Sequence, residues 1–469
     1  MNKYLFLMFF PMWLWAEDYQ PKNTAELQLP DKVQGIEQPS VREKFSTPAA
    51  KAKAVEVDKK TLLANPALLK RAMYSVLLTQ QIDGIRVILP IYRQLADADS
   101  LLITYAEALL AHYQGQLTRA INGYRQVIAK EPKMSVARLN LAMALYVNRQ
   151  SMAARDQLTR LQSEQLPKPV AETVKQIIAR IDREEDWQFD VNFYYRQENN
   201  INNAPEQSKM DYQGGQLTFQ PPEKAHGLHL AFGAKKRFNL NDNLYTNLQL
   251  NADSDFFWDN HPYDDLSLRT GVGFGYQTAK FNAEIQPFIK KRFYGTQPYS
   301  LTAGAGGHFS YQLSPRWKLS NHWEWSYETF NQRKFLNGQR HFIGLSALYI
   351  PSPQQYWSAG INYYNSQAKY QEDQFYRTGM FIGWGQEWPK GLSSNLTLSA
   401  GRRHYDGVDF FNIKRADKEY TARLSLWHRG IHYLGITPRL VWSYNKTDSN
   451  HFYYKKQENT VNLEFSKAF

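Results

Sequence analysis

From Trp187 onward, the chain alternates apolar and polar residues in stretches of about ten residues, a length that suits a tilted membrane strand. In the final stretch, ENTVNLEFSKAF, an extended backbone would place Val461, Leu463, Phe465 and Phe469 on one side. Similar stretches bounded by turn residues include LSLRTGVGFGYQ, FNAEIQPFIKKRF, WKLSNHWEWSYETF, HFIGLSALYI, SSNLTLSAGRRHY and EYTARLSLWHR. This pattern predicts strands that have one apolar face and one polar face.

Short and long connections alternate between these stretches. Short turns such as QTAK, LSPR and WPKG alternate with longer polar segments at 252–265, 291–299, 329–339, 365–374, 403–417 and 444–455. A soluble sandwich would hide its apolar face, whereas this alternation is typical of a transmembrane barrel with tight periplasmic turns and longer outer loops.

The number of strands follows from counting back from the C-terminus. There are about fourteen if WQFDVNFYYRQ is the first strand and 197–225 is an outer loop. An even number places both ends of the barrel in the periplasm. We expect the last strand to pair with the first, because that closure removes both free edges of the sheet.

Residues 58–186 show a helical period instead. The segment LLITYAEALLAHYQGQLTRAINGYRQVIAKEP contains two amphipathic runs that are separated at Gly115. It fits the tetratricopeptide pattern, with a small residue at Ala108, and a shift of 34 residues brings Ala142 to the same place, although Arg149 then stands at the turn. The prediction is a short solenoid with a concave face. A plain helical bundle with an accidental period is the alternative.

The N-terminal segments predict export from the cytoplasm. Residues 1–16, MNKYLFLMFFPMWLWA, combine Lys3 with a short apolar run and a final small residue, which predicts a secretory signal peptide. Residues 17–57 are rich in Pro, Lys, Gln and Glu, which predicts a disordered periplasmic segment. The chain has no cysteine, so a disulfide scaffold, a thiolate metal site and a cysteine nucleophile are excluded.

Composition agrees with strands that have two different faces. Aromatic residues make up 14% of the chain and charged residues 21%, and the mean hydropathy is −0.59. The formal net charge of +12 could indicate nucleic acid, but Lys and Arg are scattered through every segment of a chain that carries an export signal. We therefore expect no nucleic-acid partner.

Candidate chemistry is sparse. His226 and His229 are three residues apart in a strand or loop and would not face one ligand together. The glycine-rich GAGGH at 304–308 has no following helix to bind phosphate, so close packing inside a strand is the preferred interpretation. Asp264 and Asp265 are interpreted as a solvated loop pair rather than a calcium site. We predict no catalytic residue, no cofactor and no metal, and hence no enzyme.

Several longer motifs resemble one known family, the surface lipoprotein assembly modulators, which are the outer-membrane translocons of the type XI secretion system. The resemblance covers nearly all of the chain after the signal. It rests on LLKRAMYSVLLTQQIDGIRVILPIY at 68–92, NNINNAP at 199–205, WGQEW at 384–388, GLSS at 391–394, LSLWHRGIHYLGITPRL at 424–440 and the terminal EFSKAF.

The resemblance implies an α+β multidomain chain in the outer membrane of a Gram-negative bacterium. A tetratricopeptide-like solenoid at 58–186 would lie in the periplasm, followed by a transmembrane antiparallel barrel at 187–469. Such proteins move lipoproteins, or related haem- and metal-scavenging or host-colonisation proteins, to the cell surface. The implied partners are a client encoded near this gene, the barrel-assembly machinery and outer-membrane lipid.

The route of the client follows from the width of the barrel. A barrel of about fourteen strands is too narrow for a folded domain, so an unfolded client or lateral opening between the first and last strands is expected. A passive porin-like nutrient channel with a periplasmic interaction domain is the alternative function.

Overall fold

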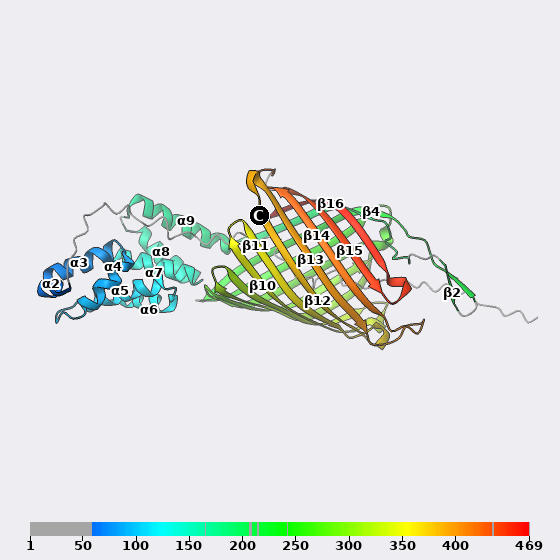
Figure 1. The fold of residues 1–469 in the computed structure, drawn as a ribbon, viewed down its shortest axis with the longest axis horizontal. Helices are drawn as coiled ribbons and strands as arrows, with labels where there is room; N and C mark the ends of the chain where they lie inside the picture. Colours follow the sequence, from blue (N-terminus) through cyan, green and yellow to red (C-terminus); the bar gives the residue numbers. More distant parts are fainter. Residues whose placement is uncertain are drawn as a thin grey trace, which may run out of the picture.

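The computed structural model describes residues 59–164, 166–205, 209–212, 215–241, 243–433 and 436–468. Within these residues, eight helices are followed by a closed barrel of fourteen antiparallel strands, which confirms the predicted order of a helical part and a barrel. The two parts follow one another along the long axis of the molecule (Figure 1). The predicted signal peptide at 1–16 and the predicted disordered segment at 17–57 lie outside the described residues.

The helices pair in the order in which they occur along the chain. None of the described helices is long and apolar enough to cross a membrane. Successive antiparallel pairs are α3 with α4, α5 with α6, and α7 with α8. The helices are α2 (Lys59–Ala64), α3 (Pro66–Leu78), α4 (Ile82–Tyr92), α5 (Ser100–Tyr113), α6 (Leu117–Lys130), α7 (Ser135–Val147), α8 (Ser151–Gln162) and α9 (Lys168–Glu184).

The turn inside each pair is closed by the same device. Gln80, Gly115 and Arg149 all adopt a left-handed backbone, with φ of 51°, 74° and 63°. The following residue then donates its backbone N–H to a carbonyl five residues earlier, at 2.9 Å in the second and third turns and 3.0 Å in the first. This is a Schellman cap that satisfies an otherwise free helix carbonyl. The 34-residue shift predicted from sequence is therefore a structural repeat, even though only one of the three turns uses glycine.

Close approach of paired helices depends on small side chains. Ala108 of α5 is 2% exposed, and a Cβ built on Gly123 of α6 would lie only 2.8 Å from the Ala108 Cβ. Beside this contact, Tyr105 accepts a hydrogen bond of 2.8 Å from the Asn140 amide of α7. Burial raises the pKa of the Tyr105 hydroxyl above its ordinary value. The helix pairs therefore share one continuous core.

We expect Ala108→Leu to destabilise the helical part by about 1–3 kcal/mol, because the longer side chain would overpack against Gly123. Thermal unfolding followed at 222 nm would show the loss as a lower midpoint for the helical signal. Ala129→Leu is the matched control, since Ala129 lies exposed on α6. Equal midpoints for the two variants would contradict the tight contact.

The barrel closes by pairing its first strand with its last, which confirms the expected closure. A small hairpin, β2 (Lys209–Tyr212) and β3 (Gly215–Thr218), lies in the loop after β1. The barrel strands are β1 (Trp187–Glu198), β4 (Ala225–Asn241), β5 (Leu244–Phe257), β6 (Asp265–Gln277), β7 (Phe281–Tyr294), β8 (Gln297–Ser314), β9 (Trp317–Phe330), β10 (Gly338–Ser352), β11 (Gln355–Ser366), β12 (Phe375–Glu387), β13 (Leu392–Tyr405), β14 (Ala416–His428), β15 (Thr437–Ser449) and β16 (Lys456–Ala468).

The outer face of the barrel is apolar. Exposed Leu, Ile, Val, Phe, Tyr, Trp and Met side chains recur at alternate positions along the strands, as at Leu398 (β13), Leu440 (β15) and Leu463 (β16). Most of the buried charged side chains lie on strands, at the intervening positions. Apolar surface facing outward and charge facing inward is the arrangement of a barrel in lipid, the reverse of a soluble domain.

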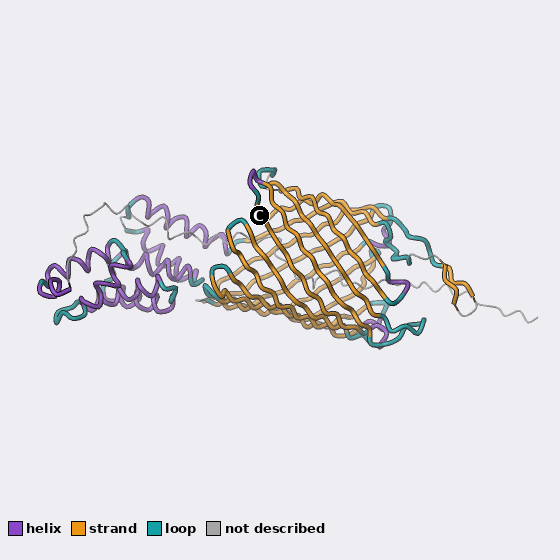
Figure 2. The backbone as a smooth tube through the Cα atoms, viewed as in Figure 1, coloured by secondary structure: helices purple, strands orange, loops and turns teal. Residues whose placement is uncertain are grey.

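The two ends of the barrel differ in their connections (Figure 2). The end nearer the helices has mostly tight turns, while the far end carries the longer loops with short 3₁₀ helices at residues 261–263, 334–336, 371–373 and 452–454. The prediction of a long loop at 291–299 is wrong. β7 and β8 are joined by Gly295 and Thr296 alone, both with positive φ, so the strands extend further than the polar residues suggested.

Candidate functional site

The interior of the barrel holds arginine–carboxylate pairs at several levels. Arg292 of β7 donates two hydrogen bonds to Asp265 of β6, at 3.0 and 2.7 Å. Arg269 of β6 reaches past two strands to Glu324 of β9 at 2.9 Å, and its guanidinium lies 3.5 Å from the centre of the Phe288 ring. Such paired charges make a polar lining that a hydrophilic polypeptide can contact and that lipid cannot.

Glu419 of β14 is the centre of a group that joins three successive strands. It accepts a hydrogen bond of 2.5 Å from Arg377 of β12 and lies 2.8 Å from Arg403 of β13. The Arg403 side chain is only 4% exposed, and it lies over the Phe375 ring at 5.0 Å. One carboxylate therefore balances two guanidinium groups from two neighbouring strands.

The seam between β1 and β16 is the shortest ladder in the barrel. β1 pairs with β4 along its whole length, residues 187–198, but with β16 only through residues 190–194 against 464–468. β16 in turn pairs with β15 through residues 456–466. Among the described residues, 195–198 of β1 and 457–463 of β16 therefore have no ladder partner across the seam. We call these two segments the seam window.

The seam window lies in the half of the barrel that is remote from the helices. Below it, towards the helices, the rings of Phe193 and Phe465 stack across the seam at 5.2 Å. Beyond the window, the loop after β1 bridges the two sides: Asn203 accepts a hydrogen bond from Lys456, and the Phe219 ring lies 5.8 Å from that of Phe452. The two sides are thus joined at both ends and unpaired between them.

The helical part contacts the barrel through the turn between α7 and α8. Asn243, which is 6% exposed and lies in the β4–β5 turn, donates to the backbone carbonyl of Asn148 at 2.6 Å and accepts from the Gln150 amide at 3.0 Å. Asn239 donates to Glu185, just after α9, at 2.7 Å. These bonds hold the solenoid at the barrel end that carries the tight turns.

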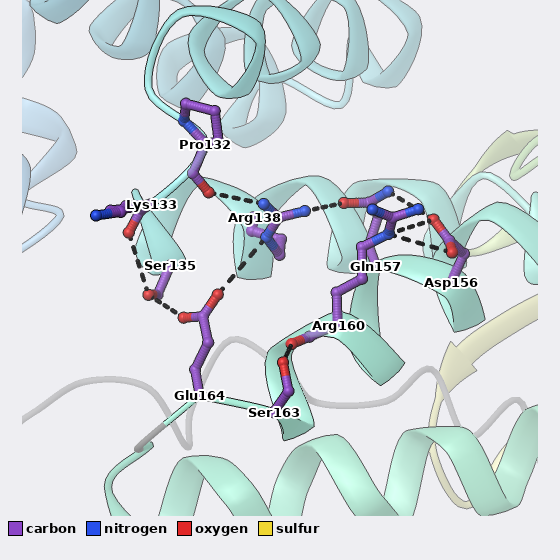
Figure 3. A network of polar contacts seen from close by, with 9 residues as sticks. All are labelled: Pro132, Lys133, Ser135, Arg138, Asp156, Gln157, Arg160, Ser163 and Glu164. Carbon is purple, nitrogen blue, oxygen red and sulfur yellow. Dashed lines mark hydrogen bonds and ion pairs between the residues drawn. The ribbon is translucent and has the colours of Figure 1, made fainter.

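A polar network stiffens the third helix pair (Figure 3). Arg138 of α7 donates to the Gln157 amide oxygen of α8 at 2.9 Å and to the Pro132 carbonyl at 2.7 Å. Its Nε lies 3.8 Å from Glu164, which also accepts a hydrogen bond from the Ser135 hydroxyl. Arg138 thereby fixes the loop after α6 and the end of α8 relative to α7.

A basic groove of about 290 Å³ lies between α4, α5 and the start of α6. Three guanidinium groups and one carboxylate line it; Glu107 pairs with Arg93, and Arg86 pairs with Asp83, which is outside the lining. The residues that line it are Arg86, Leu89, Pro90, Arg93, Glu107, Leu110, Ala111, Gln114 and Arg119. The excess of positive charge favours an acidic segment in this groove.

Comparison with known proteins identifies the family. A family model described as "Surface lipoprotein assembly modifier" matches residues 187–469, and a model of the N-terminal TPR repeats of the same family matches residues 55–158. The chain belongs to the surface lipoprotein assembly modifier family. Membership places it in the outer membrane, in agreement with the apolar outer face of the closed barrel, and identifies the helix pairs as TPR repeats.

Relatives align over most of the chain. A surface lipoprotein assembly modifier of Pasteurella multocida is 33% identical over 90% of this chain and 87% of its own. Surface lipoprotein assembly modifier 1 of Neisseria meningitidis is 36% identical over 89% of this chain and 86% of its own. The hemophilin secretion modulator of Acinetobacter baumannii is 22% identical over 86% of each chain. This member of the family therefore has both parts that its relatives have.

The residues singled out from sequence occupy separate places in the structure. His226 bonds Asp259 at 2.6 Å, whereas His229 bonds Asp255 at 2.7 Å, so the two histidines do not share a partner. Among the described residues, no three His, Asp or Glu side chains are grouped so as to hold a metal ion. The expectation that this family member has no catalytic residue, cofactor or metal stays a prediction.

Two further sequence interpretations can be compared with the structure. The glycine-rich 304–308 lies inside β8, and a Cβ at Gly307 would lie 2.3 Å from the Trp323 ring, which confirms close packing. The interpretation of Asp264 and Asp265 as a solvated pair is wrong for Asp265, which is 5% exposed and faces Arg292 inside the barrel. Asp264 remains in the loop and accepts from the Phe257 backbone N–H at 2.7 Å.

Sequence reasoning did not find the interior ion pairs or the seam window. Arginines and carboxylates at the inward positions of predicted strands were the available signal, since those positions alternate with the apolar ones. Which arginine meets which carboxylate depends on the register of strands that are distant in sequence. The unpaired length of the seam depends on that register as well.

Proposed function

We propose that this protein is an outer-membrane translocon that brings specific lipoproteins, or related secreted proteins, to the cell surface. The observation that carries the proposal is the fixed placement of a TPR solenoid at one mouth of a closed barrel with a polar interior. The solenoid lies in the periplasm and binds the client. The barrel then provides the route across the outer membrane.

Family membership supports export of surface lipoproteins as the general task. Haem- or metal-scavenging clients are a finer part of the proposal, supported by the relative that is named for hemophilin secretion. The basic groove between α4 and α6 supports a role for the solenoid in binding an acidic part of the client. The client is encoded near the gene of this protein, and the barrel-assembly machinery inserts the barrel into outer-membrane lipid.

The proposal is tested in cells that naturally produce the protein, after its gene has been deleted and then restored. Lipoproteins are labelled with radioactive palmitate, and intact cells are treated with protease. We expect at least one labelled lipoprotein to be cleaved only when the protein is present. Identical cleavage patterns in both strains, across every labelled lipoprotein, would count against the proposal.

A further inference from the structure

The charged side chains that line the barrel interior make it an unfavourable path for the acyl chains of a lipid-linked client. The interior is lined with ion pairs such as Arg269–Glu324 and Arg377–Glu419. Acyl chains that entered this lining would separate charged groups from their partners without replacing those contacts. A lipoprotein therefore needs a path on which its peptide meets polar groups while its acyl chains stay in lipid.

The seam window offers such a path. Its outer margin is apolar and faces lipid: Val461 is 62% exposed and Leu463 51%, with Tyr195 on the opposite side. Its inner margin is charged, since Arg196 of β1 lies 2.6 Å from both Glu198 and Asp255, and Glu464 of β16 binds Arg423. Each of these ion pairs joins residues on the same side of the seam, so separating the two sides leaves them intact.

The backbone of the seam window can also bind the peptide of the client. In the ladders of this barrel, each strand normally pairs on both of its edges, but β16 pairs only with β15 over residues 457–463. Backbone N–H and C=O groups that have no partner at membrane depth are costly. An extended peptide can satisfy them by strand addition, with its alternate side chains facing lipid and the interior.

We propose that the seam window is the lateral exit of this translocon and that it is occupied by the extended, lipid-linked segment of the client. The peptide pairs with the free edge of β16 while the acyl chains lie against Val461 and Leu463. The stacked Phe193 and Phe465 and the bridging loop at Asn203 hold the barrel together at the two ends of the window. This inference rests on the proposed export function and specifies its route.

A disulfide across the window tests the proposal. When the seam closes in the register it has at 190–194, Gln197 lies opposite Val461, at the spacing of facing residues in an antiparallel pair, which a disulfide can span. The native chain has no cysteine, so Gln197→Cys with Val461→Cys introduces the only thiols. Ser399→Cys with Thr421→Cys, which are register partners in β13 and β14, is the matched control.

The readout is protease cleavage of palmitate-labelled lipoproteins on intact cells that produce each variant. We expect the oxidised window pair to reduce surface lipoprotein to the level of cells that lack the protein, and a reductant to restore it. The control pair should export normally in both states. Export by the oxidised window pair at the level of its reduced form would overturn the lateral exit, while the reduced form would still report the translocon function.

Two other outcomes are also decisive. Equal loss with the window and control disulfides would overturn the inference, because stiffening any part of the barrel would then be sufficient. Absence of lipoprotein at the surface even with the native chain would reject the export function itself. Heat-modifiable migration on gels shows whether each variant has assembled its barrel, and only assembled variants are compared.

Discussion

A chain that lacks residues 59–185 should assemble its barrel but bring no client to the cell surface. The barrel ladders are formed entirely by residues 187–468, and the hydrogen bonds between the two parts include those of Asn243 and Asn239 with the solenoid. Their loss costs about 1 kcal/mol per hydrogen bond, which is small beside the many backbone bonds of the barrel. In the proposed function, by contrast, client binding needs the extended helical surface.

Heat-modifiable migration measures barrel assembly in this experiment, and protease cleavage of lipoproteins on intact cells measures export. The full-length Asn243→Ala variant is the control, because it loosens the junction while it retains the client-binding solenoid. We expect it to export more than the deletion and no more than the native chain. Export by the deletion at the native level would show that the solenoid does not engage the client.

Replacement of Glu419 should destabilise the barrel more than other single charge removals. In Glu419→Leu, Arg377 and Arg403 lose the carboxylate that they share inside the barrel. Breaking a buried ion pair by removing one partner costs about 3–5 kcal/mol, because the remaining charge stays buried without that partner. Unfolding by guanidinium in detergent, followed by tryptophan fluorescence, should show the midpoint moving to a lower concentration.

Glu387→Leu is the matched substitution, on β12, which is separated from β14 by one strand. Its carboxylate is 52% exposed and lies 3.7 Å from Arg429. An exposed pair of this kind contributes about 0–1 kcal/mol, so its midpoint should stay close to that of the native chain. If both variants unfold at the same concentration, the buried group around Glu419 does not hold β12, β13 and β14 together as we describe.

Local sequence patterns were enough to predict both parts of the fold. The alternation at Val461, Leu463 and Phe465 predicted the last strand and its lipid-facing side, because side chains in a strand alternate by simple geometry. The helical repeat was visible despite Arg149 at a glycine position. Its φ of 63° shows that the rest of the turn imposes the left-handed conformation on a residue that does not favour it.

The ion pairs inside the barrel and the unpaired length of the seam could not be predicted from local sequence patterns. Asp265 follows Asp264 in sequence, yet Asp265 faces the barrel interior and Asp264 lies in a loop, because β6 begins at Asp265. Arg269 and Glu324 are 55 residues apart and meet across β7 and β8, whose registers determine which residues of β6 and β9 come together. The register between β1 and β16 determines where these two strands stop pairing, because a shift of one strand by one residue would change the partner of every residue in the ladder.

Export in a reconstituted pair tests the central claim most directly. This protein is produced together with each small secreted or lipidated protein encoded beside its gene, and protease accessibility is measured on intact cells. The account predicts that one neighbour becomes accessible only when this chain is present, which also identifies the client. If every neighbour stays protected while small solutes enter the cells faster, the protein is a passive channel and the account is wrong.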